Sequence, residues 1–149
     1  KAAVEAVIRG YGKVDGLAWS SLRATGVFGL AHPVERSKWV EVIRDCRDGR
    51  VPSARGGTEV YGPDLARAVH VLLTAPAEQV AGEAFNVSDV YVTHRAVARL
   101  VGGPLPEPSP GPDGLMLTGK LQKLGWRPSG WRAVEAMVQS LRRSLDEAG

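Results

Sequence analysis

The side chains that most often carry metal or nucleophilic chemistry are few in this chain. Its 149 residues include three histidines, His32, His70 and His94, and a single cysteine, Cys46. No pair of these has metal-ligand spacing, and Cys46 falls on an expected helix beside charged residues. His70 is expected to be structural, and His94 is expected to be exposed in the first turn of a helix. The sequence therefore predicts neither a metal site nor thiol chemistry.

A glycine-containing loop offers a different kind of site. Residues 17–23 are predicted to form a buried strand, and a loop with glycine and proline is expected from Thr25 to Val34. Open α/β sheets bind ligands at the carboxyl ends of their strands, and glycine lets a ligand approach the backbone closely. We therefore expect the segment from Ala24 to Gly29 to contact a ligand. A plain turn is the alternative.

The elements that would position this loop alternate between helices and strands. Apolar residues at helical spacing predict helices over residues 1–11, 38–48, 63–75, 94–101, 119–124 and 130–145. Gly12 and Gly49 are expected to end the first two, and Ser37, Thr93, Thr118 and Ser129 are expected N-caps. Strands are expected at Leu17–Arg23, Thr58–Tyr61 and Glu83–Ser88, with the first and third as parallel neighbours. Three strands are few for a free-standing doubly wound sheet, which suggests that further strands complete it.

Composition excludes several classes of partner. The net charge is +3, but basic residues are interspersed with acidic ones, so no nucleic-acid surface is predicted. No stretch approaches the roughly 18 apolar residues of a membrane span, so no membrane is expected either. One cysteine allows no internal disulfide, which fits the cytoplasm. The chain opens on Lys1 rather than methionine, and we expect a processed or partial chain.

Four segments, in order along the chain, carry a recognisable pattern. They are Lys1–Glu5 leading to Leu22-Arg23-Ala24-Thr25-Gly26-Val27-Phe28-Gly29, then Thr58–Ala68, Gly82–Asp89, and Leu124-Gly125-Trp126-Arg127-Pro128. The set resembles the extended short-chain dehydrogenase/reductase family, also called NAD-dependent epimerase/dehydratases. The corresponding family segments run from the lysine of Tyr-x-x-x-Lys to Leu-Arg-Pro-x-x-Val-Tyr-Gly. They continue with Phe-Val-Tyr-Val-Asp-Asp-Val-Ala-Arg-Ala, Gly-x-x-Tyr-Asn-Val-Gly and Leu-Gly-Trp-x-Pro. The ordered set is more specific than any one piece.

The resemblance implies an α/β fold: the C-terminal part of a Rossmann-like doubly wound parallel sheet plus a small, mostly helical substrate-binding lobe. Residues 1–149 would form one partial domain, with 1–35 and 58–92 as Rossmann-like elements and 36–57 and 93–149 as lobe elements. The implied function is hydride transfer between NAD or NADP and a hydroxyl or carbonyl carbon of a small polar substrate such as a sugar. We expect this chain to be inactive without the other half.

The same resemblance assigns a catalytic and cofactor-binding role to Lys1. A free tyrosine has a pKa of about 10, and an ammonium group within ~4–6 Å can lower the pKa by ~1–3 units, which makes the tyrosine a usable base. The lysine would also bond the nicotinamide ribose. Ala24, Thr25, Gly26 and Val27 would run beside the nicotinamide. Ala24 replaces the family's usual proline, and Gly26 stands where many members have asparagine.

Expected substrate-binding residues follow this loop. His32, Arg36 and Lys38 lie where the family's substrate lobe begins. Nucleotide-sugar members usually carry an arginine at the position of Gly57, and its loss argues against a nucleotide-diphosphate sugar, although Arg55 lies two residues away. The first helix is a candidate surface for a homodimer.

Two alternative functions remain open at this level. A fold does not fix a function, so a non-catalytic nucleotide-sensing or partner-binding protein is the second hypothesis. The residue four places before Lys1 discriminates between the two, because a tyrosine there supports the enzyme. A basic nucleic-acid-binding domain is a weaker third hypothesis, which steep salt dependence of binding would support.

Overall fold

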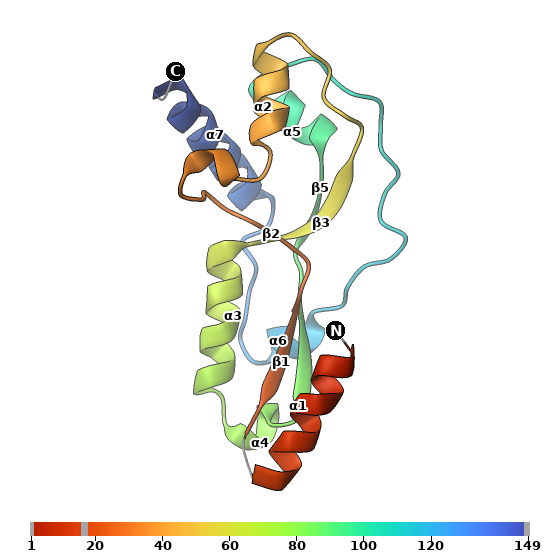
Figure 1. The fold of residues 1–149 in the computed structure, drawn as a ribbon, viewed down its shortest axis with the longest axis vertical. Coiled ribbons are helices and arrows are strands. Elements are labelled where there is room, and N and C mark those ends of the chain that lie inside the picture. The colour runs from red at the N-terminus through yellow and green to blue at the C-terminus, as the bar shows by residue number, and fades with distance from the viewer. Residues whose placement is uncertain (1, 16–17, 148–149) are drawn as a thin grey trace.

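The computed structural model describes residues 2–15 and 18–147 (Figure 1). The helices are α1 (Ala2–Asp15), the 3-10 helix η1 (Val34–Arg36), α2 (Val40–Arg47), α3 (Gly62–Thr74), α4 (Ala77–Val80), α5 (His94–Val101), α6 (Gly119–Lys123) and α7 (Trp131–Glu147). The strands are β1 (Ser20–Ala24), β2 (Gly26–Phe28), β3 (Gly56–Tyr61), β4 (Glu83–Val87) and β5 (Val90–Thr93). No helix in these ranges is long and apolar enough to cross a membrane.

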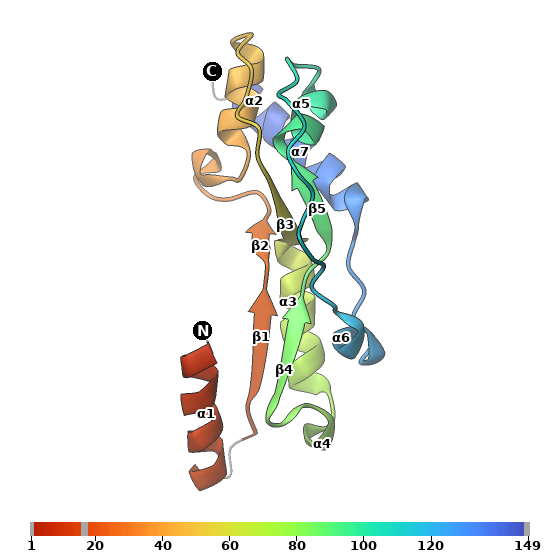
Figure 2. The same cartoon turned by 90° about the vertical axis from the view of Figure 1, so that its right-hand side faces the viewer.

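Two small sheets continue one another. β1 pairs with β4 in parallel, with Ser20 opposite Glu83 and Ala24 opposite Val87, so the predicted parallel pair is confirmed. β2 pairs with β3 in parallel, and β3 pairs with β5 antiparallel. Figure 2 shows β1 leading directly into β2, and β4 leading into β5. The carboxyl ends of β1 and β4 therefore meet the second sheet in the middle of the molecule.

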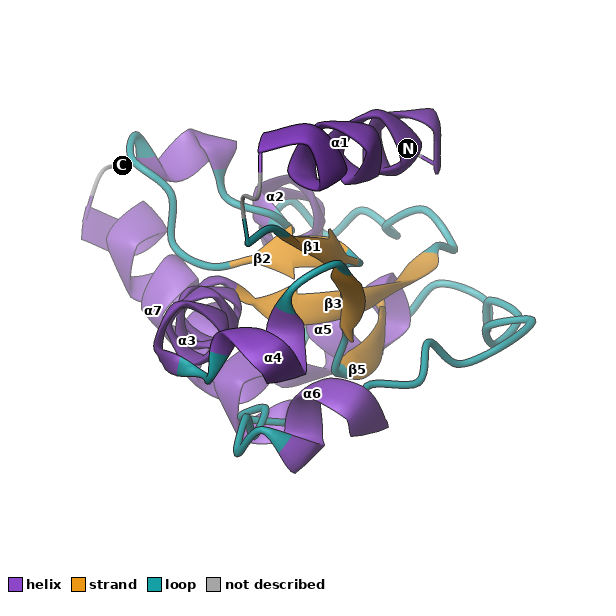
Figure 3. Ribbon diagram, turned by 90° about the horizontal axis from the view of Figure 1, so that it is seen from below, coloured by secondary structure: helices purple, strands orange, loops and turns teal. Residues whose placement is uncertain are grey.

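Helices cover both faces of the β1–β4 sheet. Figure 3 shows α1 on one side of β1 and α3 on the other. The carboxylate of Glu5 on α1 accepts hydrogen bonds from Ser21 and Arg23 of β1, which holds the helix to the strand. The apolar stripe predicted for the first helix is exposed, at Val4, Val7, Ile8 and Tyr11.

The buried apolar side chains form two clusters, one beside each sheet. The larger joins Phe28 and Val92 to residues of α2, α5 and α7. The smaller joins Val60, Phe85 and Val87 to α3 and to the segment around Trp126. The helix α7 buries one face, as the periodicity predicts: Val134, Val138, Leu141 and Leu145 lie in the core. Trp131, predicted for the same stripe, is exposed.

A buried carboxylate ties the first turn of α3 to the segment before α7. The side chain of Asp64 is fully buried, and it accepts hydrogen bonds from the backbone N–H of Ser129 at 2.7 Å and from the Ser129 hydroxyl at 2.8 Å. It also pairs with Arg67, and its backbone carbonyl accepts the indole N–H of Trp126 at 2.8 Å. The prediction that Ser129 caps the last helix is therefore wrong, because its hydroxyl is engaged by Asp64.

Other local predictions had mixed outcomes. Thr93 caps α5 as expected, accepting from the N–H of Ala96. Ser37 does not cap α2; its hydroxyl instead accepts a hydrogen bond from Ala31 N–H. Gly12 does not end α1, which runs to Asp15.

Several short elements were not predicted. The segment from Thr25 to Val34, expected to be loop, contains β2 and the start of η1. The strand β5 and the short helix α4 were also missed. All four are three or four residues long, which is too short for a period to be visible.

Candidate functional site

The predicted ligand loop lies at the junction of the two sheets. Ala24 ends β1, and Gly26 and Val27 belong to β2. Between them, Thr25 donates its backbone N–H to the carbonyl of Val87, which is the last residue of β4. The loop is therefore held at the carboxyl ends of two parallel strands, where open α/β sheets bind ligands.

An ion pair between the half-buried Lys38 and the buried Glu59 fills the space in front of Gly26. The Lys38 ammonium lies 2.5 Å from Glu59 Oε2, and only 6% of Glu59 is exposed. A Cβ atom at position 26 would come within 2.7 Å of Lys38 Nζ and 2.8 Å of the Glu59 carboxyl carbon. Gly26 is thus needed here for lack of space, because any side chain would overlap the pair.

This ion pair forms one wall of a polar cleft of about 340 Å³. Two cationic and three acidic side chains line it together with a histidine, a tryptophan and two glycines. These residues are Glu35, Lys38, Trp39, Glu41, Arg55, Glu59, His94, Gly56 and Gly57. Two of the predicted substrate residues, Lys38 and Arg55, therefore lie in the same cleft.

His94 is fixed in orientation at the rim of this cleft. Its Nδ1 lies 3.0 Å from the carbonyl oxygen of Ser53, so Nδ1 carries the proton and donates it. Burial lowers the pKa of His94, and the nearby Arg55 charge acts in the same direction, whereas the hydrogen bond to Ser53 opposes them. The imidazole is therefore neutral near pH 7, and Nε2 is a hydrogen-bond acceptor. The expectation that His94 is merely exposed is wrong.

A second, more open cleft lies along the predicted loop. Val27 to Ala31 form one side, and Arg36 and Lys38 reach it from the segment that follows, so Lys38 lines both clefts. His32 is exposed and lines neither cleft. Lys1 lies outside the described residues.

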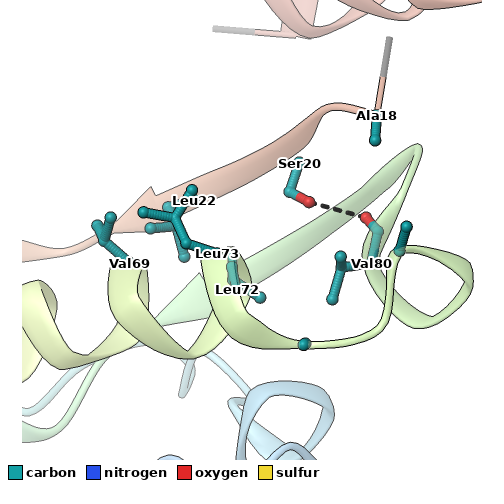
Figure 4. Close-up of a pocket in the computed structure, with 9 residues that line it drawn as sticks. Ala18, Ser20, Leu22, Val69, Leu72, Leu73 and Val80 are labelled. Carbon is teal, nitrogen blue, oxygen red and sulfur yellow. Dashed lines mark hydrogen bonds between the residues drawn. The ribbon is translucent and has the colours of Figure 1, made fainter. Parts of the chain in front are cut away.

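An apolar groove opens between β1 and α3. Figure 4 shows Leu22 of β1 facing Val69, Leu72 and Leu73 of α3, with the Ser20 hydroxyl bonded to the carbonyl of Val80. The groove measures about 450 Å³. Among the described strands β1 pairs only with β4, so its other edge and this groove are uncovered.

Metal chemistry has no support in the described residues. Within residues 2–15 and 18–147, no group of three or more histidine, cysteine or acidic side chains is placed to hold a metal ion. Burial and the neighbouring charge of Asp45 raise the pKa of Cys46, which disfavours its thiolate.

We expect the Glu5–Arg23 pair to make stability depend on acid pH. The hydrogen bond from Arg23 lowers the pKa of Glu5 from 4.5 to about 2 in the folded state. A carboxyl with a lowered folded pKa stabilises the fold above its unfolded pKa, and this contribution is lost as pH falls toward the folded value. Thermal unfolding of the wild type and of Glu5→Gln between pH 5 and pH 2 should therefore converge as pH falls. Glu41→Gln, at an 80% exposed side chain, is the control. Parallel curves for the wild type and Glu5→Gln would contradict this assignment.

Comparisons with known proteins give a consistent fold and no sequence relative. No protein-family model and no curated protein sequence matches the chain. Among solved structures, a UDP-glucose 4-epimerase of Thermotoga maritima with UDP-glucose matches 97% of this chain and 52% of its own, at 20% identity and TM-score 0.72. A UDP-glucose 4-epimerase of Thermus thermophilus in complex with NAD matches 95% and 52%, at 23% identity and TM-score 0.69.

A third similar solved structure is a dehydrogenase rather than an epimerase. A monomeric L-threonine 3-dehydrogenase from a metagenome matches 96% of this chain and 54% of its own, at 17% identity and TM-score 0.69. The chain thus spans about half the length of the solved structures it matches. It has the α/β fold of the C-terminal half of Rossmann-fold epimerases and dehydratases.

Proposed function

We propose that this chain is the substrate-side half of an NAD(P)-dependent oxidoreductase or epimerase of the extended short-chain dehydrogenase/reductase type. The observation that carries the proposal is the fold: nearly the whole chain superimposes on half of enzymes such as an epimerase in complex with NAD. The reaction would be hydride transfer between the nicotinamide and a hydroxyl or carbonyl carbon of a small polar substrate.

The geometry of the sheet junction supports this assignment. A nicotinamide beside Ala24–Val27 would lie at the carboxyl ends of β1 and β4. Val27 lines the second cleft, and Lys38 lines both this cleft and the polar cleft. A substrate in the cleft that contains Lys38 and Arg55 would then be close to the cofactor. Arg36 would contact substrate from the second cleft. His32 has the least support as a substrate-binding residue, because it lines neither cleft.

The roles of Lys1 and of the cofactor follow from the resemblance. Lys1 would lower the pKa of a catalytic tyrosine and bond the nicotinamide ribose, in a polypeptide that also carries that tyrosine. NAD or NADP would bind mainly to the other half, where a glycine-rich turn at a helix N-terminus receives the pyrophosphate. No Gly-x-Gly-x-x-Gly occurs in these 149 residues.

The uncovered edge of β1 supports a second half. A strand edge with unpaired backbone groups favours pairing with another strand, and an apolar groove of about 450 Å³ lies beside it. A further parallel strand in that position would extend the sheet and cover Leu22 and Leu73. The homodimer through α1 is a proposal of the same kind, since its apolar stripe is exposed.

Titration of the 149-residue chain with NAD and NADP tests where the cofactor binds. We expect very weak binding, because the pyrophosphate has no glycine-rich turn to bind here. Micromolar affinity would contradict the proposal. A polypeptide that joins this chain to a dinucleotide-binding half should reduce NAD(P)⁺ with a polyol or sugar, followed by the absorbance of the reduced nicotinamide. Cofactor binding without any hydride transfer would instead favour a non-catalytic nucleotide sensor.

A further inference from the structure

We propose that the polar cleft binds an uncharged, polyhydroxylated compound through two hydrogen-bond acceptors, Glu59 and His94, rather than a nucleotide diphosphate. The inference rests on the proposed function, because it names the substrate class of that site. Neither acceptor was among the expected site residues.

Glu59 presents an unpartnered oxygen at the wall of the cleft. The residue is more than nine-tenths buried, and its Oε2 is occupied by Lys38. Its Oε1 has no hydrogen-bond partner in the described part of the chain and is still accessible to solvent. A solvent-accessible carboxylate oxygen accepts hydrogen bonds from water, and an O–H donor from a ligand can take the place of that water.

His94 supplies a second acceptor. Its Nδ1 proton is directed to Ser53, which leaves Nε2 with a lone pair, and within residues 2–15 and 18–147 no group donates to it. His94 is one of the residues that line the cleft. Because the imidazole is held in one tautomer, it accepts a hydrogen bond from a hydroxyl without reorganising.

The charges around the cleft disfavour a diphosphate. Glu59 is paired with Lys38, and Glu41 is paired with Arg44. Among the described lining residues this leaves the positive charge of Arg55 against the carboxylate of Glu35. An anion brought beside Glu59 Oε1 would meet a like charge in a partly desolvated site, which costs free energy. A neutral hydroxyl group can donate to Glu59 and accept from Arg55 at the same time.

Gly57 leaves room for such a ligand. Gly56 and Gly57 line the cleft, and a Cβ at position 57 would lie 3.0 Å from Glu59 Oε1. A side chain there would cover that carboxylate oxygen. Gly56 instead makes room for Tyr91, because a Cβ at position 56 would come within 2.6 Å of the Tyr91 hydroxyl oxygen.

Titrations followed by amide chemical shifts of the labelled 149-residue chain test this proposal. The probes are myo-inositol and glucose as neutral polyols and uridine diphosphate as the anionic competitor. We expect the polyols to shift the amides of Gly56, Gly57 and His94, with uridine diphosphate binding there more weakly. Tighter binding of uridine diphosphate in this cleft, or no polyol shift at these amides, overturns the proposal.

Variants assign the acceptors. Glu59→Gln and His94→Phe should each weaken polyol binding, by about 10-fold or more for the charged acceptor, since hydrogen bonds to charged groups are the stronger ones. Glu135→Gln, at an exposed carboxylate on α7 that does not line the cleft, is the control and should bind like the wild type. If Glu59→Gln does not fold, His94→Phe carries the test, and unchanged polyol affinity in a folded variant overturns the role of that residue.

The binding measurements need no cofactor. The proposed polyol binding and the proposed NAD(P)-dependent activity can therefore be contradicted independently of each other. Polyol binding without hydride transfer in the joined protein would leave the cleft assignment standing and overturn the enzyme. Hydride transfer on an anionic substrate, with no polyol binding, would support the enzyme and overturn the cleft assignment.

Discussion

Asp64→Ala is expected to lower the free energy of unfolding by about 3–5 kcal/mol, the scale seen when one partner of a buried charge network is removed. The carboxylate is fully buried and accepts two hydrogen bonds from Ser129, in addition to pairing with Arg67. Its loss leaves the Ser129 N–H without its partner and releases the segment that leads into α7. Because α7 supplies much of the larger core, the effect should extend beyond the first turn of α3.

Urea denaturation of the wild type and Asp64→Ala measures this difference directly. Asp146→Ala is the control, because Asp146 forms a surface pair with Arg47 and its side chain is 59% exposed. Exposed pairs contribute about 0–1 kcal/mol, so this variant should be close to wild type. Equal losses for the two variants would show that the Asp64 network does not stabilise the fold. Asp64→Asn, which keeps one carbonyl oxygen, should fall between them.

The Asp64 network shows what sequence reasoning could and could not reach. Asp64 is the second residue of the helix expected over residues 63–75, so local rules place it in a first turn, where an acidic side chain is favourable. Its partner Ser129 is 65 positions away, and a hydroxyl beside an expected helix start is predicted as a cap on local grounds. Only the tertiary fold decides which acceptor or donor such a side chain meets.

Some of the strands could likewise be predicted from the sequence, and others could not. The parallel pair β1–β4 was predictable, because both segments are short and are bounded by glycine and helix signals. The expected burial of the first strand was wrong, because no residue of β1 is fully buried. The three-residue strand β2 was not, since Gly26-Val27-Phe28 has no alternation to recognise and looks like a turn. It exists because its backbone completes the edge of β3.

The candidate site was predicted in part for a related reason. Lys38 and Arg55 were expected near substrate from the resemblance, and the structure places both in one cleft. Glu59 and His94 were missed. A glutamate inside the strand expected at Thr58–Tyr61 was the available signal for Glu59, because a charged residue that is buried in a sheet needs a partner. For His94 no local signal exists, since its orientation depends on Ser53, 41 positions earlier.

Gly26→Ala is expected to have the second largest effect, a loss of about 1–3 kcal/mol from overpacking. The new methyl group would lie within 2.7 Å of Lys38 Nζ and 2.8 Å of the Glu59 carboxyl carbon. Either the Lys38–Glu59 ion pair is displaced from its present position, or β2 shifts away from β3. Gly29→Ala is the matched control in the same loop, because the nearest atom to its Cβ would be 3.9 Å away.

A double-mutant cycle identifies the cause of that loss. Glu59→Ala removes the group that the new methyl would overlap, so Gly26→Ala should cost much less in the Glu59→Ala background than in the wild type. The expected coupling lies within the range of about 0.5–3 kcal/mol that contacting residues show. Additive losses would mean that the glycine is needed for another reason, such as backbone freedom in β2. Strong coupling would instead show that Gly26, Lys38 and Glu59 pack as one unit. The loop expected beside the cofactor could then not change without affecting Glu59, the carboxylate proposed to bind substrate.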